Sequence, residues 1–150
     1  METYAFMQTL GEKMNKIQHF YHEWAKAQGV NYNILAVLYV SYKNPQCTQK
    51  QICNEWGLLK QTASNICIQL KKDGIITQIP STCDKREMCI QLTEKGRSMA
   101  APIVERLLKF ETAVLNHMGV ANTREFLNTY SQFSDFIEIE FTKSASRQNY

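Results

Sequence analysis

Apolar residues recur every three or four positions at the N-terminal end of the chain, which is the spacing of one helical face. This stripe comprises Phe6, Leu10, Met14, Ile17, Tyr21 and Trp24. It predicts an amphipathic helix over about residues 2–27 that Gly29 ends. Such a helix is longer than one small core needs, so we expect it to do more than cover that core.

Two further stripes follow Gly96. The first predicts a helix that Gly119 ends, with Pro102 near its start, and contains Ile103, Leu107, Phe110, Val114 and Met118. The second predicts a last helix and contains Phe126, Tyr130, Phe133, Ile137 and Phe141. The polar tail from Lys143 to Tyr150 is expected to fray.

Between the long helices, the pattern predicts shorter elements. Asn31 is placed to cap a helix that Lys43-Asn44-Pro45 closes and whose inward residues are Ile34, Leu35, Val37, Leu38 and Ser41. Thr48 and Gln51 are spaced as a capping box, which predicts the start of a short helix that Gly57 ends.

A second helix is predicted over Lys60–Lys72, where the Asp73-Gly74 turn ends it. Ile75–Ile79 then predicts a strand that Pro80 stops. After a polar loop, a half-buried strand is predicted from alternation: Met88, Ile90 and Leu92 on one face, Cys89 and Gln91 on the other. The order of elements is therefore helix, turn, helix and a two-stranded hairpin.

The helix over Lys60–Lys72 has two chemically distinct faces. Its inward face is expected to comprise Ala63, Ile66, Cys67 and Leu70, while the other carries Lys60, Gln61, Thr62, Ser64, Asn65, Gln69 and Lys72. No carboxylate occurs before Asp73, whereas a solvated face usually mixes both charges. Amines, amides and hydroxyls suit a groove of phosphates and base edges. An ordinary surface helix is the alternative.

The polar loop and the segment after it carry a family resemblance. Asp84-Lys85-Arg86 at a hairpin tip, followed by Leu92-Thr93-Glu94-Lys95-Gly96, resembles the wing of the MarR (multiple antibiotic resistance regulator) family of winged-helix transcription factors. The segment from Leu70 to Ile76 matches that family's entry to the wing, and Thr48-Gln49, Ile52 and Gly57 match its preceding helix. The chain departs from the family pattern at Leu59, Asn65, Gln69 and Cys83.

This resemblance implies a mostly α fold with a small β wing. A winged helix-turn-helix over residues 31–96 is flanked by dimerisation helices in 1–29 and 97–142. The expected protein is a cytoplasmic homodimer, and a repressor that a small aromatic or phenolic effector releases from DNA. The amphipathic stripes favour the same assembly, because one winged helix cannot bury them all. A monomeric helical bundle is the alternative.

The expected partner is a pseudo-palindromic, A·T-rich duplex. Asn65 or Gln69 is expected to contact adenine, and Arg86 to enter the minor groove with Asp84 orienting its guanidinium. The full set of expected DNA contacts is Thr48, Gln49, Lys60, Gln61, Thr62, Ser64, Asn65, Gln69, Lys72, Ser81, Thr82, Asp84, Lys85 and Arg86.

Composition and charge are consistent with an anionic partner. The chain has 150 residues, 44% hydrophobic and 21% charged, as in a soluble globular domain. It lacks an apolar run long enough to span a membrane, and the N-terminus has no signal-peptide pattern. Residues 48–86 hold six Lys or Arg against three acidic residues, whereas residues 94–150 balance seven with seven. The positive charge is therefore concentrated in the central unit.

No catalytic motif appears, so we expect neither an enzyme nor a cofactor. His19 and His22 with Glu23 are too few to predict a metal site. Five cysteines without a CxxC pair fit a reducing compartment, and Cys47 and Cys83 are the expected exposed thiols. Two alternatives stay open: a winged-helix module that binds protein, and a regulator that responds to thiol oxidation.

Overall fold

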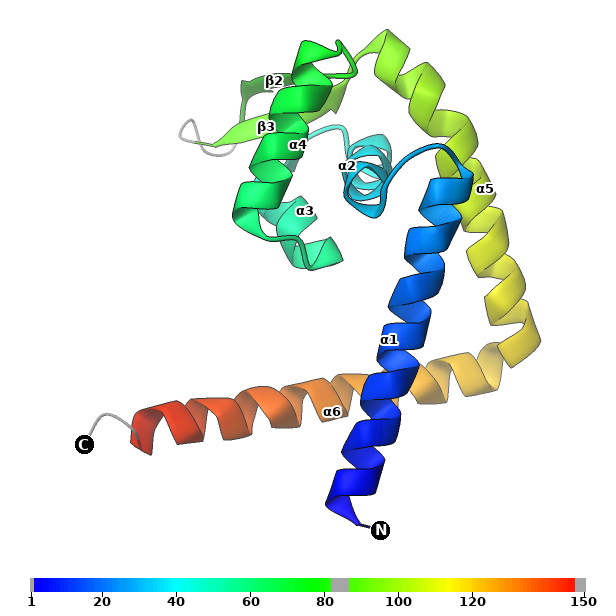
Figure 1. Ribbon diagram of the computed structural model, residues 1–150, viewed down its shortest axis with the longest axis vertical. Helices are drawn as coiled ribbons and strands as arrows, with labels where there is room; N and C mark the ends of the chain where they lie inside the picture. Colours follow the sequence, from blue (N-terminus) through cyan, green and yellow to red (C-terminus); the bar gives the residue numbers. More distant parts are fainter. Residues whose placement is uncertain (1, 82–86, 148–150) are drawn as a thin grey trace. The chain divides into compact units, whose positions relative to one another are not determined.

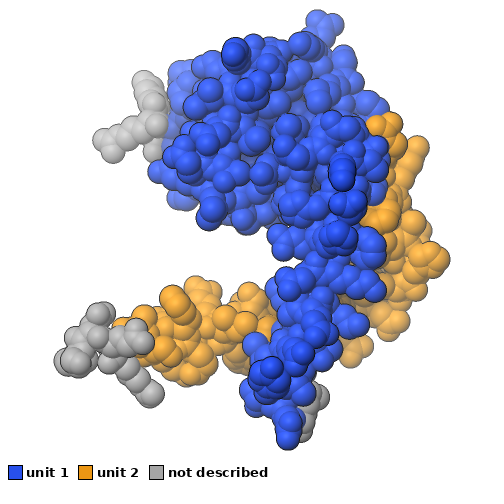
Figure 2. All heavy atoms as spheres, viewed as in Figure 1, with its two compact units in different colours: residues 1–105 blue, residues 106–150 orange. Residues whose placement is uncertain are grey.

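The computed structural model describes residues 2–81 and 87–147, and it divides into two compact units, residues 1–105 and 106–150 (Figure 2). The first unit holds α1 (Thr3–Ala27), α2 (Tyr32–Lys43), β1 (Cys47–Thr48), α3 (Gln49–Trp56), α4 (Lys60–Lys72), β2 (Ile76–Pro80) and β3 (Met88–Leu92). It also holds the start of α5 (Glu94–Met118), whereas the second unit holds the rest of α5 and α6 (Val120–Arg147). Figure 1 shows the hairpin β2–β3 beside α4.

The predicted helix boundaries in the first unit are confirmed where capping residues mark them. Asn31 accepts a hydrogen bond from the Ile34 backbone N–H at 2.8 Å, which starts α2. Gly57 ends α3 in the left-handed region at φ 64°, where a side chain would be strained. The helix predicted over Lys60–Lys72 has these same bounds in the structure.

The three strands form an antiparallel sheet in the order β1-β3-β2. The predicted strand from Ile75 begins one residue later, because the Ile75 N–H donates to Leu70 O at 2.8 Å and completes the end of α4. Pro80 belongs to β2 and pairs with Met88, which an edge strand tolerates. The strand β1 has only two residues and was not predicted.

The predicted alternation along β3 is wrong at its first two positions. Met88 is 44% exposed, and Cys89 is as buried as its neighbour Ile90. Consecutive side chains point to opposite faces of a sheet, so both faces of β3 are covered at Cys89 and Ile90. The strand lies between β1 and β2, and Cys89 pairs with Thr48 on one side and Ile79 on the other.

The core of the first unit gathers side chains from each of its helices and strands, and α1 contributes Ala25 alone. The largest fully buried side chains in this unit are Leu35, Leu38, Ile52, Ile76 and Ile90. Ala63, Cys67 and Leu70 of α4 are also buried, as predicted, whereas Ile66 is half-buried. The face of α4 opposite this core is therefore free for another role.

A tight junction joins the end of α4 to α5. The Thr93 hydroxyl donates to Gly74 O at 2.6 Å and accepts from the Gly96 N–H at 3.0 Å, so α5 begins at Glu94 rather than after Gly96. The Thr93 N–H donates to Ile75 O at 3.0 Å. A Cβ on Gly96 would overlap that same oxygen and lie 2.9 Å from the Ile75 carbonyl carbon. Glycine is therefore required at this close approach.

The long helices leave much of their predicted apolar stripes exposed. Ile17 of α1 is 55% exposed, and Phe126 and Phe141 of α6 are 56% and 73% exposed. The prediction of a frayed tail is wrong for residues 143–147, where α6 continues to Arg147, and residues 148–150 of that tail lie outside the described residues. An ion pair between Lys143 and Glu140 at 2.6 Å spans one helical turn there. No helix among the described residues is long and apolar enough to cross a membrane.

Candidate nucleic-acid interface

The helices α3 and α4 are positioned by local hydrogen bonds. Thr48 Oγ1 accepts from the Gln51 N–H at 3.3 Å, and Gln51 Oε1 accepts from the Thr48 N–H at 2.8 Å, which confirms the capping box. Gln49 Nε2 donates to Lys60 O at 3.2 Å, so the start of α3 is tied to the start of α4. Leu59, at the N-cap of α4, provides no side-chain cap.

The outward face of α4 is exposed and polar, as the sequence predicts. Lys60, Gln61, Asn65, Gln69 and Lys72 are exposed, whereas Thr62 and Ser64 are half-buried. Residues 61, 65, 69 and 73 are spaced by four and form a line along the helix, which we call the polar line. The face can thus present amides and amines to a ligand along three turns of helix.

The side chains of the polar line are bonded in two pairs. Gln61 Nε2 donates to Asn65 Oδ1 at 2.9 Å. Gln69 Nε2 donates to both carboxylate oxygens of Asp73, at 3.1 and 2.9 Å. The amides that were expected to contact adenine are therefore held by neighbours on their own helix, and each keeps one polar atom for another partner.

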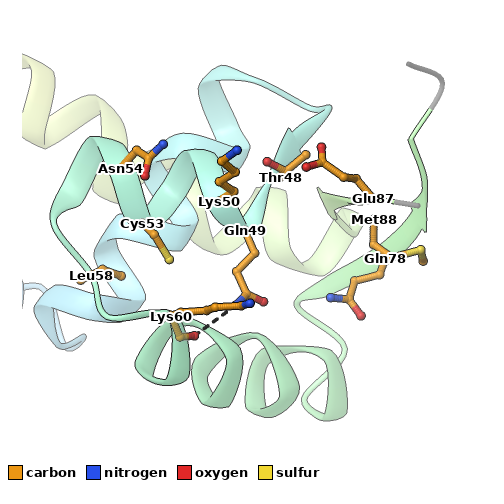
Figure 3. Close-up of a pocket in the computed structure, with 10 residues that line it drawn as sticks. All are labelled: Thr48, Gln49, Lys50, Cys53, Asn54, Leu58, Lys60, Gln78, Glu87 and Met88. Atoms are coloured by element: carbon orange, nitrogen blue, oxygen red, sulfur yellow. Dashed lines mark hydrogen bonds between the residues drawn. The ribbon is translucent and has the colours of Figure 1, made fainter. Parts of the chain in front are cut away.

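A groove of about 720 Å³ lies between α3, the start of α4 and the hairpin strands (Figure 3). It brings together three predicted contact residues, Thr48, Gln49 and Lys60. In Figure 3 the Gln49 side chain extends to Lys60, where the dashed line marks their hydrogen bond. The groove therefore continues the polar surface of α4 toward the wing.

Several lining residues were missed by sequence reasoning: Lys50, Cys53, Asn54, Leu58, Gln78, Glu87 and Met88. Lys50 and Asn54 are four residues apart on α3, a spacing that places them on one face and that the sequence could have revealed. Gln78 and Glu87 join the groove only because the hairpin packs near α3 and α4, and no local signal shows that long-range contact.

The wing consists of the hairpin strands β2 and β3 and the loop between them, and the structure describes it except for residues 82–86. Lys71 Nζ donates to Gln78 Oε1 at 3.4 Å, which links α4 to β2. Ser81, an expected DNA contact, is only 9% exposed, and its N–H donates to Glu87 O at 2.9 Å. The other expected wing residues, Thr82, Asp84, Lys85 and Arg86, lie outside the described residues.

The expectation that Cys47 is an exposed thiol is wrong. Cys47 is fully buried, within 3.4 Å of Ser41 Oγ and 3.7 Å of Ile90 O, because β1 pairs with the central strand over the core. Burial raises the pKa of the Cys47 thiol, and raises the pKa of Cys67 to about 11. Neither thiol is suited to redox sensing. Cys53 is partly exposed in the groove, and Cys83 lies outside the described residues.

The histidines of α1 do not form a metal centre with other described residues. The ring of His22 stacks on Tyr32 of α2 with centroids 4.4 Å apart, and Tyr32 contacts Trp56 of α3 at 5.2 Å. Within the part of the chain that the structure describes, no three His, Cys, Asp or Glu residues gather to hold a metal ion. His22 instead helps to join α1 to α2 and α3.

Comparison with known proteins identifies the fold. The sequence model of the MarR family matches residues 28–87. NMB1585, a MarR family regulator from Neisseria meningitidis with a solved structure, is 30% identical in sequence to this chain. The match covers 92% of this chain and 97% of NMB1585, and the two superpose with a TM-score of 0.83. NadR in complex with 4-hydroxyphenylacetate, at 14% identity and TM-score 0.62, covers 91% of this chain and 92% of its own and shares the fold.

A curated relative agrees with this comparison. The HTH-type transcriptional regulator Hpr of Geobacillus thermodenitrificans is 26% identical over 123 residues, which are 82% of this chain and 59% of Hpr. This chain thus spans less than two thirds of that relative. These relatives are transcriptional regulators and not enzymes. The match to the family model and the 30% identity to a regulator that is covered almost in full show that the chain belongs to the MarR family of transcription regulators.

Proposed function

We propose that this chain binds specific sequences of double-stranded DNA through α4 and represses transcription until a small effector releases it. The outward face of α4 is the observation that supports this most directly. Its exposed residues from Lys60 to Lys72 are amines, amides and an apolar Ile68, without a carboxylate, and they rest on a buried face. A helix of this composition suits the major groove, where phosphates and base edges both accept and donate hydrogen bonds.

Two further contacts are proposed around that helix. Thr48 and Gln49 at the start of α3, with Lys60 and Lys72 at the ends of α4, are placed to contact phosphates and to set the position of α4. Arg86 of the wing would enter the minor groove with Asp84 orienting it, which favours narrow, A·T-rich sequences. The proposed operator is accordingly A·T-rich.

The protein would act as a homodimer. The exposed apolar side chains of α1 and α6, such as Ile17, Phe20, Leu127 and Phe136, form faces that water solvates poorly. A second copy would cover them, and a twofold dimer would contact two half-sites about 10 bp apart. The predicted division into dimerisation helices, 1–29 and 97–142, and a DNA-binding domain, 31–96, belongs to this proposal.

The effector is proposed to be a small aromatic or phenolic molecule. The related fold of NadR has been observed with 4-hydroxyphenylacetate, a phenolic acid. A panel of hydroxylated aromatic acids, titrated into the protein–DNA complex, tests this by fluorescence anisotropy. A ligand of this class should lower DNA affinity and raise the thermal midpoint of the free protein. If none of these acids releases the protein from DNA, this part of the proposal is contradicted.

Selection from random duplexes tests the DNA-binding proposal as a whole. The expected result is an A·T-rich consensus with two related half-sites. Lys60→Ala should weaken binding to every sequence and reduce the salt slope by about 1, whereas Asn65→Ala should relax one position in each half-site. A G·C-rich consensus would refute the proposal of an A·T-rich operator. The absence of any consensus would refute the proposal of sequence-specific binding.

A second candidate function is a winged-helix module that binds protein. Leu59 and Ile68, at the start and middle of α4, are 76% and 65% exposed, and exposed apolar residues of this size favour a protein partner. Titration of random duplex at low salt separates the two functions. DNA binding that weakens steeply with salt supports the regulator, and its absence supports the interaction module.

A further inference from the structure

The pair formed by Gln69 and Asp73 restricts what Gln69 can offer to a ligand. Gln69 Nε2 lies 2.9 and 3.1 Å from the two carboxylate oxygens of Asp73. An ionised carboxylate only accepts hydrogen bonds, so the NH₂ group of Gln69 must face Asp73. The amide oxygen Oε1 is on the other branch of the same carbon and is directed away from the carboxylate. The two N–H bonds of that group diverge, so only one of them can point at the carboxylate. Gln69 therefore presents Oε1, with its second N–H beside it, to the outside.

The other pair of the polar line carries no such restriction. Gln61 and Asn65 are both amides, and each has a donor and an acceptor group. Both amides can turn over together and keep one hydrogen bond between them, so either an acceptor or a donor can face outward. The contrast between the two pairs follows from one residue, Asp73.

Asp73 is itself held in place at the junction with α5. Its N–H donates to Gln69 O at 3.0 Å, and its carbonyl oxygen accepts from Lys95 Nζ at 2.8 Å. The next residue, Gly74, has φ 69° and accepts the Thr93 hydroxyl at 2.6 Å. The carboxylate is thus attached to an anchored turn rather than to a loose helix end, and it keeps its position relative to Gln69.

We propose that Asp73 is a specificity-determining residue, which fixes the Gln69 amide with its oxygen outward. This inference rests on the proposed DNA-binding function of α4. With Oε1 outward and the second N–H beside it, Gln69 accepts from adenine N6 and donates to adenine N7, whereas cytosine N4 satisfies Oε1 alone. The pairing thus fixes the amide in the orientation of the two-bond contact with adenine expected from sequence, and it disfavours guanine, whose major-groove acceptors give Oε1 no donor.

The substitution Asp73→Asn isolates this role. Asparagine has nearly the shape of aspartate but offers both a donor and an acceptor, so the Gln69 amide can turn over and present its NH₂ group. Guanine and thymine, whose outward atoms in the major groove are acceptors, should then be tolerated at the contacted position. We expect the preference for adenine or cytosine there to fall about tenfold, which is the usual size of one lost base contact.

Selection from random duplexes with the full-length chain is the test, and Glu55→Gln on α3 is the matched control because it removes the same charge outside the polar line. Asp73→Asn and Gln69→Ala should relax the same position in each half-site, and Glu55→Gln should relax none. The double variant should relax that position no further than Gln69→Ala alone, because Asp73 acts through Gln69. A purely structural role of Asp73 would not produce this dependence.

If the wild-type chain selects a consensus, three outcomes overturn the inference about Asp73. One is an unchanged consensus with Asp73→Asn, and another is an unchanged consensus with Gln69→Ala. The third is tighter binding of Asp73→Asn to all sequences alike, which would show that only the charge matters. If the wild-type chain selects no consensus at all, the proposed function fails instead, and the two failures are thereby distinguished.

Discussion

Replacement of Gly96 with alanine tests whether the junction between α4 and α5 depends on a close backbone approach. The added methyl group would overlap the Ile75 carbonyl oxygen and lie 2.9 Å from its carbon. Both atoms belong to the backbone, so no rotation of a side chain can relieve the overlap. The end of α4 and the start of α5 must therefore move apart, which strains the hydrogen bonds that Thr93 makes to Gly74 and Ile75.

The magnitude follows from three effects. Forcing a methyl group into a packed site costs about 1–3 kcal/mol. Loss of two junction hydrogen bonds costs about 1 kcal/mol each. Alanine raises the free energy of unfolding by about 1 kcal/mol, because it favours a helix more than glycine does. Steric overlap and lost hydrogen bonds outweigh helix propensity, and we expect Gly96→Ala to lower the free energy of unfolding by about 2–4 kcal/mol.

Urea denaturation followed by circular dichroism measures the effect, at one protein concentration because a dimer unfolds in a concentration-dependent way. Gly11→Ala is the matched control: Gly11 also lies inside a helix, but a Cβ added there would meet no atom within 4 Å. That variant should gain about 0.5–1 kcal/mol. Equal gains in stability for both variants would refute the steric argument.

The capping box and the buried thiols support three other predictions. Thr48→Ala should lower the free energy of unfolding by about 1 kcal/mol, because the Gln51 N–H loses its acceptor, and thermal denaturation measures this. Burial raises the pKa of Cys67 from 9.0 to about 11, so between these values the unfolded chain releases a proton that the native chain keeps. The free energy of unfolding should therefore fall as pH rises from about 9 to about 11, and it should fall less in the Cys67→Ala variant than in the wild-type chain. Native alkylation followed by mass spectrometry should modify Cys53 before Cys47 or Cys67.

Each of these has an outcome that contradicts it. An unchanged melting temperature for Thr48→Ala would show that water replaces the cap without cost. A pH dependence identical in Cys67→Ala would assign the alkaline loss of stability to other groups. Rapid alkylation of Cys47 in the native chain would contradict its burial over the core.

Short-range signals in the sequence were sufficient for much of the fold. The boundaries of α4, the capping box of Thr48 and Gln51, and the left-handed turn at Gly57 were all predicted correctly. Each depends on interactions within about four residues, which a linear pattern contains. The same locality explains why the polar face of α4 was evident from the order of its residues alone.

Long-range contacts decided what the sequence could not show. Cys47 and Ser81 are polar or weakly polar residues in short loops between predicted elements, and nothing near them marks either as buried. Cys47 is covered because β1 pairs with β3, more than 40 residues later in the chain. The expectation of an exposed thiol failed because burial depends on what the rest of the chain brings to a residue.

The role of Gly96 shows the same division. The Leu-Thr-x-x-Gly pattern supported the family resemblance, but the sequence alone does not say why that position requires glycine. The requirement comes from the Ile75 carbonyl, 21 residues earlier, against which the start of α5 packs. Helices and caps are thus determined by neighbouring residues, whereas burial, close approach and strand pairing are determined by contacts that form only when distant segments meet.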